Sequence, residues 1–149
     1  KKHKKHFKNF QIKKIQKISF SENFISYISN FSICLNARFL SFANLKKGKI
    51  VVYDREKEEI KIVYQKFFEN PSCLAVSPNN KLIIIGDNKG KITIWSIKTG
   101  FCILKFSNHL LAINKVSFFK FFSRLAISTS KDGTLKIYDL KKCIVIRTF

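Results

Sequence analysis

The sequence predicts an all-β fold built from repeated four-stranded units. Three segments share one pattern, a glycine turn followed by a strand that ends in an aromatic residue: Lys47–Asp54, Lys89–Ser96 and Asp132–Asp139. Their glycines lie 42 and 43 residues apart, and so do their aromatic residues. A period of roughly 40–45 residues is typical of the four-stranded blade of a β-propeller. We therefore expect a segment of a propeller.

Side chains alternate within each repeated strand. Ile92 and Ile94 are separated by polar residues, and the third segment repeats the alternation. A period of two predicts a half-buried strand instead of a helix. Tyr53 and Trp95, which end the first two repeated strands, are the predicted aromatic residues of their blades.

Turn and strand signals set the boundaries of the units. The segment 77–80, which reads SPNN, predicts a turn between strands at 72–77 and 82–86. Residues 101–106 predict an outer strand, and residues 143–149 match them one unit later. The units then span 15–56, 57–98 and 99–141, and residues 142–149 start the outer strand of the next unit.

The chain length corresponds to about three to three and a half blades. Closed propellers have about four to eight blades. An open arc of blades leaves sheet edges that invite pairing with another chain. We therefore expect this chain to be an internal fragment of a longer protein with further blades.

The charge has two interpretations. The formal net charge is +20, while 46% of the residues are hydrophobic, which is enough for a packed core. A strongly positive surface attracts nucleic acid. The abundance of Lys, Asn, Ile and Phe is also what an AT-rich coding sequence produces, so the charge can reflect composition alone.

Apolar stretches and cysteines indicate the compartment. No stretch approaches the roughly 18 uninterrupted apolar residues of a membrane helix, so we expect a soluble protein without a membrane partner. The cysteines have no CxxC pair and lie in apolar stretches, at Cys34, Cys73, Cys102 and Cys143. This pattern predicts buried, reduced thiols in an intracellular protein.

The third unit resembles a WD repeat. Its polar residues fall near the positions of the WD-repeat tetrad, in which a chain of hydrogen bonds holds a loop against the blade: His109, Ser128, Asp132 and Tyr138. Tyr138 stands where the family has Trp, and Ser130 competes for the Ser position. The first two units lack the tetrad, so we expect packing alone to hold their loops.

An alternative interpretation makes His109 and Asp132 half of a catalytic pair. Neither a nucleophile nor a glycine-rich oxyanion loop accompanies them in the sequence, so we assign them a structural role. His3 and His6 leave a tetrahedral zinc site half empty. We expect no catalytic residue, cofactor, metal or small-molecule substrate.

The segment from residue 100 onward resembles one WD-repeat family more specifically. The resemblance to the periodic tryptophan protein 2 family extends over residues 32–149 and is strongest at Gly100–Cys102, Ser128–Thr134 and Arg147–Phe149. It implies a non-catalytic propeller scaffold in the UTP-B subcomplex of the small-subunit processome. It also implies a nucleolar location, protein subunits as partners, and pre-ribosomal RNA and small nucleolar RNA nearby.

Two other functions remain open. A basic cluster at Lys1, Lys2, Lys4 and Lys5 offers phosphate contacts for a module that binds RNA directly, or is a solvated loop. A WD-repeat chain can also be a generic interaction adaptor of a ubiquitin ligase, of chromatin or of a signalling complex. These alternatives differ in the partners that they predict.

Overall fold

The computed structural model describes residues 28–33, 38–44, 49–64 and 71–149. Within these ranges no helix is long and apolar enough to cross a membrane. The strands, in chain order, are β1 (Ile28–Ile33), β2 (Phe39–Asn44), β3 (Lys49–Asp54), β4 (Glu59–Tyr64), β5 (Pro71–Val76), β6 (Leu82–Asp87), β7 (Ile92–Ser96), β8 (Cys102–Phe106), β9 (Ile113–Phe119), β10 (Phe122–Ser130), β11 (Leu135–Asp139) and β12 (Ile144–Thr148).

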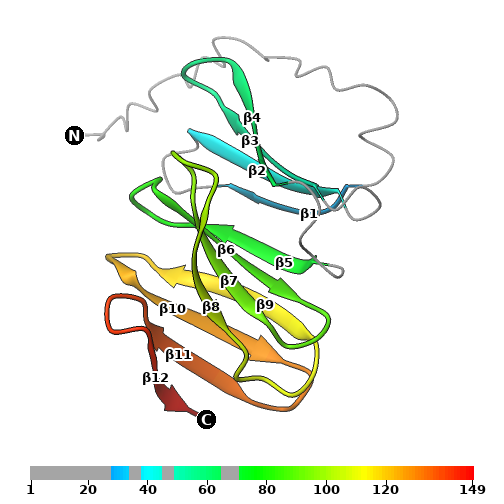
Figure 1. Cartoon of the computed structure of the whole chain (residues 1–149), viewed down its shortest axis with the longest axis vertical. Helices are drawn as coiled ribbons and strands as arrows, with labels where there is room; N and C mark the ends of the chain where they lie inside the picture. Colours follow the sequence, from blue (N-terminus) through cyan, green and yellow to red (C-terminus); the bar gives the residue numbers. More distant parts are fainter. Residues whose placement is uncertain (1–27, 34–37, 45–48, 65–70) are drawn as a thin grey trace, which may run out of the picture.

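The strands form three antiparallel sheets of four strands each, and in every sheet sequential strands are neighbours. We call the sheets β1–β4, β5–β8 and β9–β12 the first, second and third blades. The blades follow one another through the molecule, and the first strands of neighbouring blades lie against each other (Figure 1). The all-β architecture predicted from the period of the repeat is present.

The strand boundaries agree with the sequence patterns. The turn predicted at 77–80 separates β5 from β6, and the Ser77 hydroxyl accepts a hydrogen bond from the Leu82 amide at 2.9 Å. Asn80 takes a positive φ of 59°, a conformation that Asn tolerates. β8 is the outer strand of the second blade and β12 that of the third, so the predicted sequence units are offset from the sheets by one strand.

The second blade is buried on both faces. Ile83 and Ile85 of β6 belong to the apolar cluster shared with the first blade, whereas Ile84 belongs to the cluster shared with the third. These three side chains are at most 1% exposed. Successive side chains of a strand point to opposite faces, so one run of isoleucines supplies both interfaces. Burying each such side chain contributes roughly 1.5–3 kcal/mol.

Hydrogen bonds and close backbone contacts join the second and third blades. The Ser72 hydroxyl of β5 lies 2.5 Å from the Ile113 carbonyl oxygen of β9. A β-carbon at Gly86 would lie only 2.6 Å from the Ile113 side chain. Position 86 therefore needs glycine for the two blades to approach this closely.

Candidate functional site

The third blade brings the four predicted tetrad residues together. His109 lies between β8 and β9, Ser128 on β10, Asp132 in the β10–β11 turn and Tyr138 on β11. His109 Nδ1 is 2.9 Å from Asp132 Oδ2, and His109 Nε2 is 2.7 Å from Ser128 Oγ. The Ser128 and Tyr138 hydroxyl oxygens are 3.1 Å apart. The four side chains form one hydrogen-bonded chain from a surface turn into the core.

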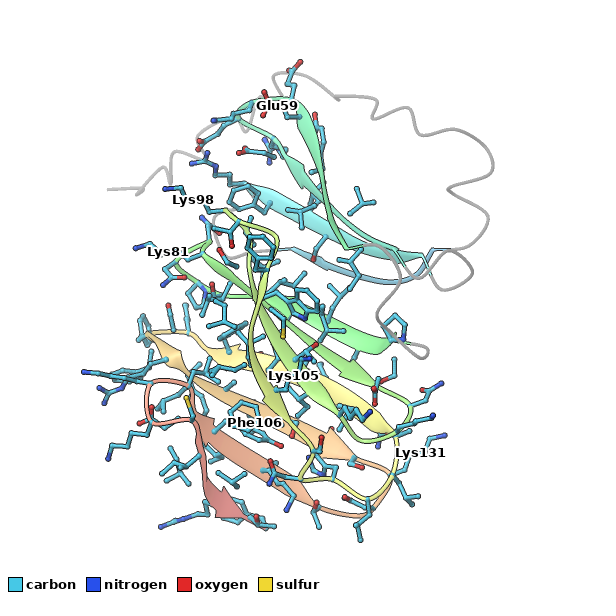
Figure 2. The ribbon with its side chains drawn as sticks, in the orientation of Figure 1. Glu59, Lys81, Lys98, Lys105, Phe106 and Lys131 are labelled. Atoms are coloured by element: carbon cyan, nitrogen blue, oxygen red, sulfur yellow. The ribbon has the colours of Figure 1, made fainter. Side chains whose placement is uncertain are left out.

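The tyrosine end of this chain is fully enclosed. Tyr138 is 0% exposed, and its ring packs against that of Phe106 with centroids 4.8 Å apart. Figure 2 shows Phe106 on β8, the outer strand of the second blade. Burial raises the pKa of the Tyr138 hydroxyl, which keeps its proton. A phenol therefore supplies the buried polar end that the family's indole supplies.

Asp132 organises the turn at the other end of the chain. Its carboxylate accepts hydrogen bonds from the Thr134 hydroxyl at 2.7 Å, the Thr134 amide at 2.9 Å and the Leu110 amide at 2.9 Å. Burial alone would raise the pKa of Asp132, but these donors and His109 outweigh it and lower the pKa well below its usual value. Thr134 Oγ1 also lies 3.0 Å from His109 Nδ1. The sequence patterns did not predict that Thr134 belongs to this hydrogen-bond network.

The order Asp132, His109, Ser128 has the connectivity of a hydrolytic triad. Its nucleophile position is closed, since Ser128 is 1% exposed and the His109 side chain is 0% exposed. Ser128 Oγ also contacts the Tyr138 hydroxyl, whose residue is 0% exposed. Because these side chains are closed to solvent, we assign the arrangement to stabilising the loop before β9 and not to an accessible triad.

Ser130 has a different role from Ser128. Its hydroxyl lies 2.9 Å from the Leu111 carbonyl oxygen and 3.0 Å from that of Ala112. The Asp132 amide donates to the same hydroxyl oxygen at 3.2 Å. Ser130 therefore ties the β10–β11 turn to the segment before β9, and Ser128 alone occupies the Ser position of the tetrad.

The second blade holds its β6–β7 turn with a carboxylate, so the expectation of packing alone is wrong there. Asp87 Oδ1 accepts hydrogen bonds from the Lys89 amide at 2.8 Å and the Lys91 amide at 2.9 Å. Asp87 ends β6 at the place where Ser130 ends β10. The corresponding turn of the first blade, 45–48, lies outside the described residues.

At the opposite ends of the blades, the residue that follows each blade aromatic stabilises the next turn through its side chain. The residue after each blade aromatic has an oxygen that accepts backbone hydrogen bonds in the turn that follows: Asp54 from Glu56, Ser96 from Thr99, and Asp139 from Lys141 and Lys142. The period of the sequence placed these residues in phase but did not predict that they accept hydrogen bonds from the turn. The backbone amide of Lys142 is the main cause that lowers the pKa of Asp139.

Asp54 also carries an ion pair that the sequence did not predict. Arg38 Nε and Nη2 lie 3.2 and 3.1 Å from the two Asp54 carboxylate oxygens, a bidentate arrangement. Arg38 Nη1 lies 2.8 Å from Glu56 Oε2. Burial would raise the pKa of Asp54, but the Arg38 guanidinium and the amides of the turn hold it below its usual value.

The predicted blade aromatics occupy equivalent, buried positions. Tyr53 on β3 pairs with Leu40, Trp95 on β7 pairs with Ile83, and both side chains are 7% exposed.

The predicted RNA contacts are not described by the structure: Lys1, Lys2, Lys4 and Lys5 lie outside the described residues.

The prediction of buried thiols is correct for one cysteine and wrong for another. Cys73 is buried, Cys102 is half-buried and Cys143 is exposed, and all three are free thiols. Cys143 sits in the turn between β11 and β12 with a positive φ of 58°, and its thiol lies 3.7 Å from the Leu140 carbonyl oxygen. Its apolar sequence neighbours belong to β12, the edge strand of the third blade among the described residues. Cys34 lies outside the described residues.

Comparison with known proteins defines the class of this fold. The family model described as WD domain, G-beta repeat, matches residues 64–96 and 100–139. A solved structure of the Mitotic Checkpoint Complex aligns with 83% of this chain and 36% of that chain, at a TM-score of 0.71 and 13% identity, which shows the fold alone. The chain is a segment of a WD-repeat β-propeller, as predicted.

Within this class, the chain is similar to periodic tryptophan protein 2. It is 27% identical to that protein of Arabidopsis thaliana over 111 residues, 74% of this chain and 12% of the relative. The Saccharomyces cerevisiae protein is 30% identical over 92 residues, 62% of this chain and 10% of the relative. The resemblance predicted from the sequence is confirmed. The chain spans only 10–12% of the length of these two relatives.

Proposed function

We propose that this chain is the propeller segment of a scaffold subunit that assembles pre-ribosomal particles in the nucleolus. The observation that carries the proposal is the similarity to periodic tryptophan protein 2, which recurs in relatives from five organisms at 26–30% identity. The resemblance to that family implies a subunit of the small-subunit processome that acts in early processing of pre-ribosomal RNA. The segment contributes binding surfaces to this task and no reaction of its own.

The loops of the blades support a role in binding proteins. The tetrad and Ser130 immobilise the segment between β8 and β9, which presents Leu110 and Leu111 with 88% and 52% of their surfaces exposed. Exposed apolar side chains on a rigid loop lose little conformational entropy when a partner covers them. A WD-repeat scaffold with pre-organised loops therefore suits stable assembly with neighbouring subunits.

The charge supports proximity to RNA. A net charge of +20 creates a field that attracts the phosphate backbone without reading its sequence. In a pre-ribosomal particle this field would favour packing of the propeller beside pre-ribosomal RNA and small nucleolar RNA. Lysines distributed over the chain would contribute to this general attraction.

A generic adaptor is the second candidate. WD repeat and SOCS box-containing protein 1 of Mus musculus is 37% identical over 60 residues, 40% of this chain and 14% of that protein. The match has a higher identity over a shorter span than the matches above. An adaptor would join partners of a different kind, so the partners distinguish the two functions.

The test is purification of the intact protein from its own cells through an affinity tag, with mass spectrometry of the proteins and sequencing of the RNA. The proposal expects other processome subunits together with pre-ribosomal RNA that still contains its spacers. Ubiquitin-ligase subunits, histones or signalling proteins without pre-ribosomal RNA would contradict it. Fluorescence microscopy of the tagged protein adds a second check, because a signal excluded from the nucleolus contradicts the proposed location.

A further inference from the structure

A cavity of about 550 Å³ lies between the first and second blades. It opens at the ends of the blades that carry the β5–β6 and β7–β8 turns. These turns contribute Lys81 and Lys98, which lie on the opposite side of the blades from Lys131 of the tetrad turn (Figure 2). The cavity is therefore separate from the loops that the tetrad holds.

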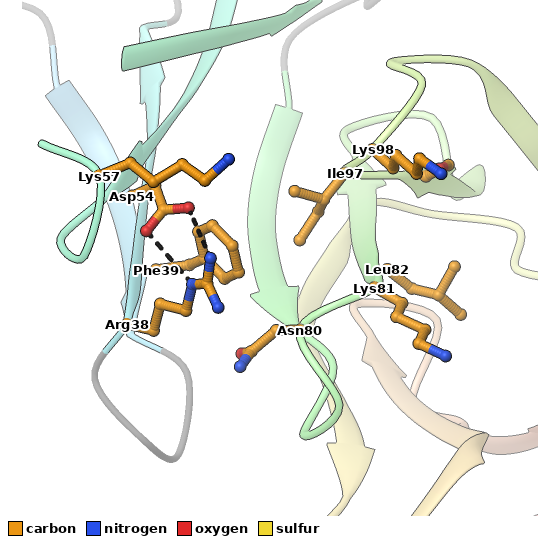
Figure 3. Close-up of a pocket in the computed structure, with 10 residues that line it drawn as sticks. Arg38, Phe39, Asp54, Lys57, Asn80, Lys81, Leu82, Ile97 and Lys98 are labelled. Atoms are coloured by element: carbon orange, nitrogen blue, oxygen red, sulfur yellow. Dashed lines mark hydrogen bonds and ion pairs between the residues drawn. The ribbon is translucent and has the colours of Figure 1, made fainter. Parts of the chain in front are cut away.

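The inner wall of the cavity is apolar. Phe39 of β2, Leu82 of β6 and Ile97 after β7 line it. Figure 3 shows the Ile97 side chain pointing from the second blade toward Phe39 and Arg38 of the first. Phe39 and Ile97 are 6% and 5% exposed, so only a small part of each contacts solvent. This wall suits one inserted aliphatic or aromatic side chain.

Basic side chains surround this wall. Lys57, Lys81 and Lys98 line the cavity and are exposed. The carboxylate that lines it, Asp54, is held in a bidentate pair by Arg38. The cavity therefore presents unneutralised positive charge to a ligand. Glu56 and Glu58, on the same turn as Lys57, and Glu59, which begins β4, are not among its lining residues.

Asn80 gives the cavity a polar group that suits a peptide. Its side-chain oxygen is buried and has no hydrogen-bond partner among the described residues. Figure 3 shows this side chain facing the first blade across the cavity. A buried amide oxygen without a partner is destabilising, and a ligand that donates a hydrogen bond to it removes that cost. A peptide N–H is one donor that can pair with this oxygen.

We propose that this cavity binds an acidic peptide segment of a partner protein, with one apolar side chain inserted between the blades. Phe39, Leu82 and Ile97 receive the apolar side chain, and the lysines contact the flanking carboxylates. Asn80 pairs with the peptide backbone. Charge complementarity selects an acidic partner, and the apolar wall favours an inserted peptide side chain over a phosphate backbone. The inference concerns one contact surface and does not depend on which complex contains the chain.

The test measures binding of a fluorescein-labelled hexapeptide, two leucines flanked by aspartates on each side, to the intact protein by fluorescence anisotropy. The variant Lys81→Ala with Lys98→Ala removes two of the three cavity lysines and leaves Lys57. The matched control, Lys141→Ala with Lys142→Ala, removes two exposed lysines from the β11–β12 turn of the third blade. All four side chains are exposed, so both variants should fold, which circular dichroism checks.

The proposal expects the cavity variant to bind the hexapeptide about tenfold more weakly, because two charge-assisted contacts are lost, and the control variant to bind like the wild type. Replacing the two leucines of the peptide by serines should also weaken binding. Equal affinity of both variants for the hexapeptide, or equal binding of the serine peptide, overturns the proposal. So does a labelled oligouridylate whose binding falls more in the cavity variant than in the control, because the cavity would then serve RNA.

Discussion

Gly90 and His109 lie so close that a β-carbon at position 90 would overlap the backbone carbonyl of His109. Gly90 is in the β6–β7 turn of the second blade, and His109 precedes the first strand of the third. The turn that Asp87 closes therefore packs directly against the residue that begins the tetrad. Through this contact, the loops of two neighbouring blades support each other.

This contact predicts that Gly90→Ala is more destabilising than Gly133→Ala. Both glycines have a positive φ, 79° and 81°, so both substitutions strain the backbone by roughly 1–2 kcal/mol. Only at position 90 would the new β-carbon also meet His109, because nothing lies within 4 Å of it at position 133. Hydrogen exchange of residues 107–114, measured by mass spectrometry, should rise more in Gly90→Ala. Equal exchange in the two variants would show that the contact has no energetic weight.

Removing the centre of the tetrad should loosen the third blade. His109→Ala leaves the buried Ser128 and the Asp132 carboxylate without their shared partner. We expect a loss of roughly 1–3 kcal/mol in the opening free energy of β10 and β11, because two hydrogen bonds are lost at about 0.5–1.5 kcal/mol each. Hydrogen exchange measures it, with Lys131→Ala as an exposed control in the same turn. Unchanged protection of β10 would contradict the structural role of His109.

The phenol at the end of the tetrad should be coupled to the serine. Tyr138→Phe keeps the ring packed on Phe106 and removes only the hydroxyl that lies against Ser128. We expect a cost of about 0.5–1.5 kcal/mol, typical of one hydrogen bond. A double-mutant cycle with Ser128→Ala should show coupling between the two residues. Strictly additive effects would indicate that the two hydroxyls do not interact.

The tetrad turn should weaken at acidic pH. The pKa of Asp132 is lowered in the folded state, so its contribution to stability is present above the usual value of 3.8 and is lost as pH falls through the folded pKa. Hydrogen exchange of residues 107–134, corrected for intrinsic rates, should show wild type better protected than Asp132→Asn at pH 6. The difference should narrow below pH 3.8. A difference that stays constant down to pH 2 would contradict the role of the ionised carboxylate.

Local patterns predicted the blades because each blade is made of contacts between neighbouring strands. The 42- and 43-residue steps placed the strands, and the tetrad residues stood in phase with them. Ser128 and Ser130 both fit the spacing, and only the structure separates them, since the Ser130 hydroxyl is engaged by Leu111 and Ala112.

Features that depend on how strands and blades pack in three dimensions were not visible in the sequence. The cavity lined by Phe39 and Ile97 joins turns from two blades, and its chemistry follows from how the blades are placed. The bidentate pair of Arg38 and Asp54 crosses between neighbouring strands. Cys143 was expected to be buried because its sequence neighbours are apolar, but its turn lies on the outer edge of the last described blade.

The most direct test of the proposed function is conditional depletion of the intact protein in its own cells, followed by pulse labelling of ribosomal RNA. If the chain belongs to a scaffold of the small-subunit processome, mature small-subunit RNA should stop accumulating while its unprocessed precursor increases and large-subunit RNA continues to form. Normal synthesis of small-subunit RNA after complete depletion would contradict the account and would favour an adaptor with other partners.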